Sequence, residues 1–121
     1  MARQAIDFSF WNEMWKQGYY DREKGIRANP LIEYWDKRAH DFSLMRKSND
    51  YDFGRKVYAA LSSVLTAEST LLDIGAGPGS FTIPFAQHIK SVTAVEPSKG
   101  MVAVLKGNAK ELGVENFNVI E

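Results

Sequence analysis

Three alternating glycines lie in a segment that has the composition of a ligand-binding loop. The segment runs from Leu71 to Ser80 and reads LLDIGAGPGS, with glycines at positions 75, 77 and 79. Glycines at these positions allow positive φ and remove side chains that would keep a ligand away from the backbone. A helix that begins after such a loop directs unpaired N–H groups toward the same place, which suits a carboxylate or another anionic group. The alternative is a turn needed only for tight helix packing.

Two carboxylates accompany this loop. Glu96 follows an apolar run 17 residues after Gly79, and a carboxylate at the end of a second strand can accept hydrogen bonds from both hydroxyls of a ribose. An adenosine-type ligand is therefore expected. Asp73 stands two residues before the first glycine, where its charge disfavours a pyrophosphate and favours a cofactor with cationic ammonium and sulfonium groups. The alternative for Asp73 is a helix-capping or helix-dipole partner.

The first half of the chain is predicted to be helical. Helical spacing of four aromatic residues predicts a short helix that ends near Gly18; these residues are Phe8, Trp11, Trp15 and Tyr19. Asn29 and Pro30 supply an N-cap and a first-turn proline for a helix from about 30 to 47. Apolar residues from Phe53 onward predict another helix that ends at about residue 66.

From residue 69 onward, strands and helices alternate. Apolar runs predict strands over 71–74, 92–96 and 117–120, with helices over about 80–89 and about 101–112 between them. Pro84 is expected to weaken the first turn of the earlier helix, and Gly113 can end the later one. Apolar strands joined by helices predict a parallel sheet with right-handed crossovers, so the fold class is α/β.

Two segments resemble a known family. Leu72 to Phe81 resembles motif I of the class I S-adenosylmethionine-dependent methyltransferases, and Val92 to Ser98 resembles their second motif. This resemblance covers about residues 69–121, and the stretch from Tyr34 to Ala39 is similar to the N-terminal helices of small-molecule methyltransferases. It implies a helical cap or lid over residues 1–66. Residues 67–121 would then form the first β-α-β-α-β part of a Rossmann-like, S-adenosylmethionine-binding domain.

The resemblance also implies a role for each motif residue. The glycine loop would lie under the methionine part of S-adenosylmethionine, and Asp73 would orient its amino group directly or through water. Glu96 would hold the ribose hydroxyls, while Pro97 and Met101 would flank the adenine. The cofactor-binding residues expected on this basis are Asp73, Gly75, Ala76, Gly77, Gly79, Glu96, Pro97 and Met101.

The family's sheet has seven strands, whereas this chain stops at Glu121, where the third strand should be finishing. We interpret the chain as an N-terminal part, with the fourth motif and most catalytic and substrate groups beyond it. A three-stranded remnant would expose an unpaired edge, so a homodimer or a strand-swapped assembly is expected.

No catalytic residue is assigned, because in methyl transfer the protein chiefly positions the reactants and excludes water. His40 and His88 could act as bases in principle, although a lone histidine on a helix is more often a surface or packing residue. A lid must cover the carboxyl ends of the strands to close a pocket. Contact with the cofactor or acceptor is therefore expected from three residues, Tyr34, Trp35 and Arg38.

Composition and net charge limit the classes of partner that the sequence predicts. The 121 residues suit one domain, and 15 basic and 15 acidic side chains give a net charge of zero. A neutral chain lacks the electrostatic signature of nucleic-acid or anionic-membrane binding, so we expect a small-molecule acceptor, no nucleic acid and no membrane. The absence of cysteine fits a cytoplasmic protein and excludes disulfides and thiolate metal sites. No metal ion is expected.

Two other function classes stay open. An NAD(P)-dependent oxidoreductase would also use a glycine loop and an acidic residue after the second strand. Its glycines would have the spacing G-x-G-x-x-G, whereas this chain has G-x-G-x-G. Alternatively, the chain could bind the cofactor without catalysis, or serve only to associate with a partner chain.

Overall fold

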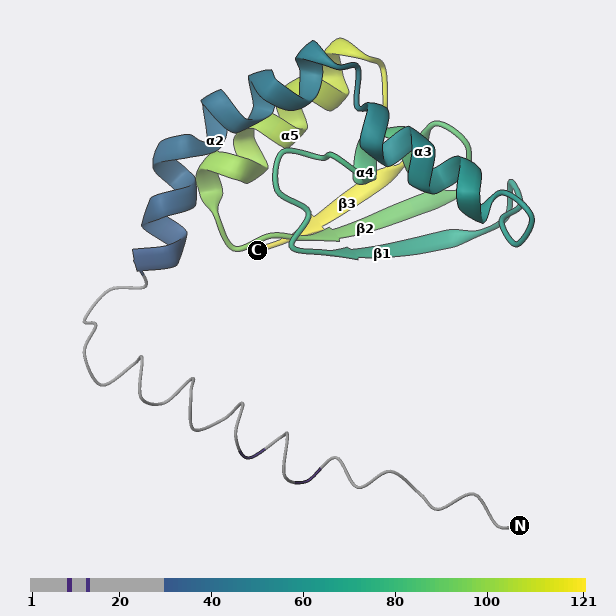
Figure 1. Ribbon diagram of the computed structural model, residues 1–121, viewed down its shortest axis with the longest axis horizontal. Helices are drawn as coiled ribbons and strands as arrows, with labels where there is room; N and C mark the ends of the chain where they lie inside the picture. The colour runs from purple at the N-terminus through teal and green to yellow at the C-terminus, as the bar shows by residue number, and fades with distance from the viewer. Residues whose placement is uncertain (1–8, 10–12, 14–29) are drawn as a thin grey trace. The chain divides into compact units, whose positions relative to one another are not determined.

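The computed structural model describes Ser9, Glu13 and residues 30–121. The helix expected near the N-terminus, with Phe8, Trp11, Trp15 and Tyr19, lies outside the described residues. Residues Leu31–Glu121 form one compact unit. Its elements in chain order are α2 (Pro30–Ser48), α3 (Asp52–Leu61), β1 (Thr70–Ile74), α4 (Thr82–Ala86), β2 (Ser91–Val95), α5 (Lys99–Glu111) and β3 (Phe117–Ile120) (Figure 1).

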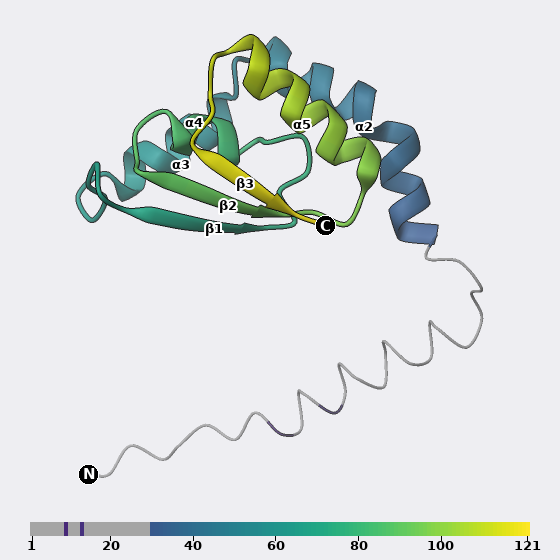
Figure 2. The same cartoon turned by 180° about the vertical axis from the view of Figure 1, so that it is seen from behind.

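The three strands form a parallel sheet in the order β1-β2-β3, as the sequence predicts. Leu71 of β1 is in register with Val92 of β2, which is in register with Phe117 of β3. The helices lie on one side of this sheet, as Figures 1 and 2 show from opposite directions. Strand residues that face the helices are buried or half-buried, whereas Ile74 on the other face is 76% exposed. The described residues therefore cover one face of the sheet.

Two groups of apolar side chains hold the helices on the sheet. The larger group includes Ile83 and Phe85 of the α4 segment, Val92 of β2 and Ala109 of α5. The smaller group joins Ala76 of the glycine loop to Ala94 of β2 and Leu105 of α5. Ala76 of the glycine loop therefore packs in the same group of apolar side chains as Leu105 of α5.

Helix α2 runs along α5 in the same direction. Three contacts connect them in increasing residue number, so the first turns of α2 lie beside the start of α5, near the carboxyl ends of the strands (Figure 1). The contacts are Asp36 with Ser98 and Gly100, Ser43 with Asn108, and Lys47 with Glu111. The Asp36 contacts therefore place the first turns of α2 at the edge of the sheet where the glycine loop is found.

Two helices are shorter than their apolar pattern predicts. Helix α3 ends at Leu61 and not near residue 66; the Ser62 hydroxyl donates to the Ala59 carbonyl at 2.7 Å, a local bond that competes with helix continuation. Helix α4 spans Thr82–Ala86 and not 80–89. The Asn116 side-chain amide donates to the carbonyl of Ala86, the last residue of α4, and to the carbonyls of Ile89 and Lys90 beyond the helix. At the Ala86 carbonyl, a side chain distant in sequence thus takes the place of the next helical hydrogen bond, because Lys90 N–H donates to the Ser69 carbonyl.

Close packing of α3 on the loop before α4 depends on a glycine. A Cβ at Gly54 would overlap the Ser80 carbonyl oxygen and lie 2.7 Å from Pro84 Cγ. We expect Gly54→Ala to lower the free energy of unfolding by about 2 kcal/mol through overpacking, measured by urea unfolding.

The matched control is Gly107→Ala in α5, where a Cβ would meet nothing within 4 Å. This variant should be neutral or gain up to about 1 kcal/mol, because alanine is the better helix former. Equal unfolding midpoints for the two variants would contradict the close packing of α3.

Candidate cofactor-binding site

The glycine loop adopts the left-handed backbone that its sequence predicts. Gly75, Gly77 and Gly79 have φ of 74°, 56° and 94°. A Cβ at Gly75 or Gly77 would meet nothing within 4 Å, so the surface of the loop beside these residues is open. At Gly79 a Cβ would lie 2.9 Å from Ile83 Cδ1 and 3.2 Å from Leu105 Cγ. The first two glycines serve the backbone turn, and the third also allows the core to pack.

Four of the loop's amide groups donate within the chain. Gly75 N–H and Ala76 N–H donate to the Val95 carbonyl at 2.8 and 3.1 Å, and Gly79 N–H donates to the Ala76 carbonyl at 3.2 Å. Gly77 N–H donates to a side chain, described next. These four amides are therefore not free to bind an anionic group, and the expectation of unpaired N–H groups at the start of the following helix stays a prediction.

Glu96, which follows β2, joins the two segments that carry the motifs. Its Oε2 accepts from Gly77 N–H at 2.8 Å, and its Oε1 accepts from Ser98 N–H at 2.9 Å. The side chain is buried, with 7% of its surface exposed. A carboxylate oxygen has two lone pairs, so each oxygen can accept one further hydrogen bond. The structure thus brings Glu96 to the glycine loop, as expected, and adds two backbone bonds that the sequence did not reveal.

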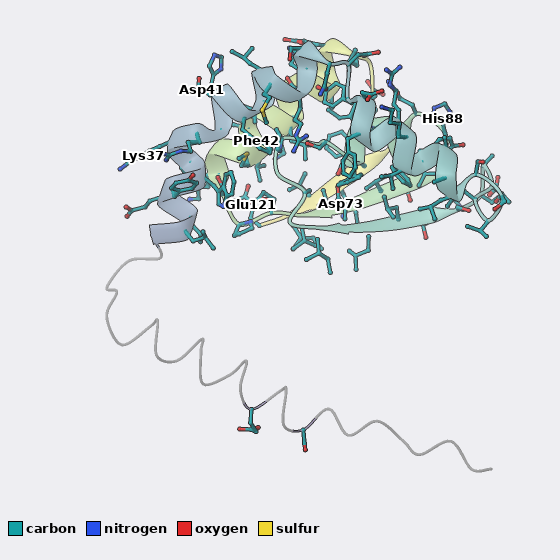
Figure 3. All side chains as sticks on the ribbon, viewed as in Figure 1. Lys37, Asp41, Phe42, Asp73, His88 and Glu121 are labelled. Atoms are coloured by element: carbon teal, nitrogen blue, oxygen red, sulfur yellow. The ribbon has the colours of Figure 1, made fainter. Side chains whose placement is uncertain are left out.

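Asp73 lies near the end of β1 on the side of the sheet that the helices cover (Figure 3). Its Oδ2 accepts from the Thr82 hydroxyl at 2.6 Å, and both residues are buried. Thr82 is the first residue of α4, so this contact fits the alternative in which Asp73 helps to hold the start of that helix. Its other oxygen, Oδ1, has no hydrogen bond to another described residue.

The other predicted cofactor neighbours differ in exposure. Ala76 and Met101 are buried, with 4% and 2% of their surfaces exposed, while Pro97 is exposed. Ala76 packs on Leu105 beneath the loop. The side chain of Ala76 therefore supports the loop from inside, and contact of Pro97 or Met101 with an adenine stays a prediction.

The three predicted lid residues interact with each other on α2. The Arg38 guanidinium lies 3.8 Å from the centre of the Tyr34 ring, and the Tyr34 and Trp35 rings meet edge to face at 5.1 Å. Trp35 also meets Phe42 at 5.6 Å, and Phe42 lies on the side of α2 that faces the sheet (Figure 3). Their contact with a cofactor or acceptor remains a prediction.

Neither His40 nor His88 has a hydrogen bond or ring contact with the glycine loop among the described residues. His88 stacks on Tyr58 of α3 with ring centres 4.4 Å apart, and it lies at the other end of Figure 3 from Lys37. His40 is exposed on α2. No catalytic role is assigned to either residue.

Asp36 lies beside the candidate site, and the sequence did not reveal its role. Its Oδ1 accepts from the Ser98 hydroxyl at 2.6 Å and from Gly100 N–H at 2.8 Å. These two hydrogen bonds, with a smaller attraction from Lys99, lower the pKa of the Asp36 carboxyl, and partial loss of water opposes them. Ser98 before a helix is a recognisable N-cap, but nothing in one sequence pairs it with a residue 62 positions earlier.

Of the helices within the described residues, none has the length and apolar character needed to cross a bilayer. The same residues contain no group of three His, Asp or Glu side chains placed as metal ligands.

Comparison with known proteins identifies the second half of the chain. Residues 71–121 match the methyltransferase domain family. The uncharacterized methyltransferase YcgJ of Bacillus subtilis is 42% identical over 50 residues, which are 41% of this chain and 20% of that protein. The 23S rRNA (uracil(1939)-C(5))-methyltransferase RlmD of Xanthomonas oryzae pv. oryzae is 39% identical over 49 residues, which are 40% of this chain.

A solved structure shares the fold. A candidate S-adenosylmethionine-dependent methyltransferase of Methanococcus maripaludis aligns with a TM-score of 0.64 and 22% identity, over 71% of this chain and 41% of that one. The chain spans 20% of the length of YcgJ and 11% of the length of RlmD. The matched part of those relatives is therefore a fraction of each protein.

These comparisons correct one expectation. The prediction of no nucleic-acid partner is wrong, because RlmD, a relative that is 39% identical over 49 residues, is an rRNA methyltransferase. Net charge is a sum over the whole chain, and a neutral cofactor-binding segment can belong to a protein whose other parts contact RNA. The preference for a small-molecule acceptor depended on the same charge argument and loses that support.

The loop geometry, the parallel β-α-β-α-β order and the sequence match all concern the same residues. Residues 71–121 match the methyltransferase domain family, and the described helices and parallel strands form part of the Rossmann-like fold of S-adenosylmethionine-dependent methyltransferases.

Proposed function

We propose that this chain supplies the cofactor-binding part of a methyltransferase that uses S-adenosylmethionine and releases S-adenosylhomocysteine. The observation that carries the proposal is the 2.8 Å hydrogen bond from Gly77 N–H to Glu96 Oε2. It joins the loops that follow two neighbouring parallel strands, at the edge of the sheet where such folds bind ligands.

The glycine loop suits S-adenosylmethionine better than a dinucleotide. A loop that binds pyrophosphate uses free N–H groups to hold the phosphate oxygens. Here the N–H groups of Gly75, Ala76, Gly77 and Gly79 already donate within the chain. The open surface beside Gly75 and Gly77 has room for an uncharged or cationic group. This arrangement favours the methionine part of S-adenosylmethionine over the phosphates of NAD.

Each expected residue has a proposed task that its position supports. Asp73 has one oxygen on Thr82, and its Oδ1 would accept from the cofactor's amino group directly or through water. Glu96 would accept the ribose hydroxyls on the lone pairs left by Gly77 and Ser98. Pro97, which is exposed, would lie against the adenine, with Met101 behind it.

Methyl transfer from a sulfonium is an in-line displacement for which the bound cofactor supplies the reactivity. The work left to this chain is to hold the donor in one orientation and to exclude water. We propose that residues 1–66 act as a cap or lid and that residues 67–121 bind the cofactor. The hydrogen bonds of Asp36 to Ser98 and Gly100, across this boundary, support a lid that rests on the cofactor-binding part.

The methyl acceptor is a separate question from the donor. RlmD is named as a methyltransferase of 23S rRNA, and it is 39% identical to this chain over 49 residues. Methyl-transfer assays on the complete protein should therefore offer RNA as well as small molecules.

The first test is calorimetric titration of the chain with S-adenosylhomocysteine, with NAD as a parallel control. We expect Gly77→Ala to weaken S-adenosylhomocysteine binding at least about tenfold, because a methyl group would enter the space beside the loop and strain its backbone. NAD should not bind either form.

Gly113→Ala is the matched control, because Gly113 has a similar φ of 66° and a Cβ there would also meet nothing within 4 Å. The two variants should lose similar stability, while Gly113→Ala keeps the wild-type dissociation constant. Full affinity in Gly77→Ala would place the cofactor elsewhere.

A second test concerns the ribose. We expect Glu96→Ala to weaken S-adenosylhomocysteine binding by about 2 kcal/mol, because it removes charge-assisted hydrogen bonds to the hydroxyls. Calorimetry measures the dissociation constant, and Glu115→Ala, at an exposed glutamate after α5, serves as the control. Unfolding is measured on the same samples, because Glu96 also accepts from two backbone amides. An unchanged dissociation constant in Glu96→Ala would refute the ribose role.

A further inference from the structure

A continuous set of hydrogen bonds leads from α2 to the glycine loop. The Asp36 carboxylate accepts from the Ser98 hydroxyl at 2.6 Å. Ser98 N–H donates to Glu96 Oε1 at 2.9 Å, and Glu96 Oε2 accepts from Gly77 N–H at 2.8 Å. Three bonds therefore separate α2 from the glycine loop, and both intermediate residues are buried.

The crossing of α2 and α5 at this point is a close approach of backbones. A Cβ at Gly100 would lie 2.9 Å from the Asp36 carbonyl oxygen and 3.0 Å from Asp36 Cα. Gly100 N–H also donates to Asp36 Oδ1 at 2.8 Å. Because the main chain of α2 is in contact here, the position of the Asp36 carboxylate is set by the helix and not by a flexible side chain alone.

A second contact between the helices repeats this pattern further along. The Asn108 side-chain amide of α5 donates to the Ser43 hydroxyl of α2 at 2.8 Å, and it lies 3.5 Å from the Pro78 carbonyl oxygen in the glycine loop. Both Ser43 and Asn108 are buried. Each of these two contacts thus uses a residue in α5 or at its N-cap that also touches a segment of the candidate site.

We propose that Asp36 is a positioning residue of the cofactor site: by holding Ser98 it fixes the turn that carries Glu96, so that docking of α2 and cofactor binding stabilise each other. This inference rests on the proposed function, because it takes Glu96 as a ligand of the cofactor. Asp36 itself touches no cofactor atom in this scheme.

The physical basis is thermodynamic linkage between the docking of α2 on α5 and the binding of the cofactor. When α2 leaves α5, the Ser98 hydroxyl loses its acceptor and the turn from 96 to 98 gains freedom. A cofactor held by Glu96 needs that turn in one conformation, so it binds the docked form more tightly. By reciprocity, the bound cofactor must hold α2 on α5 to the same extent.

The test compares four forms of the chain by calorimetric titration with S-adenosylhomocysteine. Asp36→Ala should weaken binding about tenfold, within the usual range for coupled sites. Asp36→Asn should recover most of the affinity, because an amide oxygen also accepts from Ser98 and Gly100. Asp41→Ala is the control on the same helix, since Asp41 is exposed on the side of α2 away from the sheet, and it should match wild type (Figure 3).

Hydrogen exchange of the α2 amides supplies a readout that a merely structural role would not change. S-adenosylhomocysteine should slow exchange over residues 30–48 in wild type and in Asp41→Ala, and it should do so much less in Asp36→Ala. Thermal unfolding without ligand fixes a temperature at which all forms are folded.

A double-mutant cycle keeps the proposal testable if Asp36→Ala is poorly folded. Ser98→Ala removes the hydroxyl that Asp36 binds but keeps the N–H that binds Glu96. Ser98→Ala should therefore weaken S-adenosylhomocysteine binding by itself, and Asp36→Ala should cost less affinity in that background than in wild type. Wild-type affinity in Ser98→Ala, or fully additive losses, would overturn the proposal. Wild-type affinity in Asp36→Ala would overturn it too. No binding by the wild-type chain would instead overturn the proposed function itself.

Discussion

The candidate site depends on one buried carboxylate that accepts two backbone N–H groups from different loops. Glu96 accepts from Gly77 in the glycine loop and from Ser98 in the turn before α5. Hydrogen bonds to a charged acceptor are stronger than neutral ones, and leaving such a buried group unpaired is costly. The two loops are therefore held together at the carboxyl edge of the sheet, and the geometry of the site follows from this side chain.

The helices contribute to the site through the same turn. Asp36 of α2 holds Ser98, and α5 begins at the next residue, so the position of α2 depends on how the turn is built. The Ser98 hydroxyl also accepts from Met101 N–H at 3.1 Å, which caps α5. The Ser98 hydroxyl thus caps the start of α5 and also binds α2. It can do both because a hydroxyl group can donate one hydrogen bond and accept another at the same time.

The strands, the parallel order, the glycine turn and the meeting of Glu96 with the loop could be predicted from the sequence, because each follows from local composition or from parallel-strand geometry. The ends of α3 and α4 could not, because a hydroxyl at Ser62 and a distant amide at Asn116 bind the carbonyls there. Asp36 was missed for the same reason: its partners are more than 60 residues away. Net charge misled the choice of partner, because a sum over all residues does not describe how charge is distributed over the surface that meets the partner.

The distribution of donors and acceptors at this edge argues for the type of ligand. Four loop amides donate within the chain, so these four are not free for the oxygens of a phosphate. Acceptors remain: Asp73 has one oxygen without a described partner, and Glu96 has lone pairs beyond its two backbone bonds. A ligand that suits this edge must bring donors and positive charge, as an ammonium, a sulfonium and two ribose hydroxyls do. The same backbone bonds that stabilise the loop thus select against a dinucleotide and favour S-adenosylmethionine.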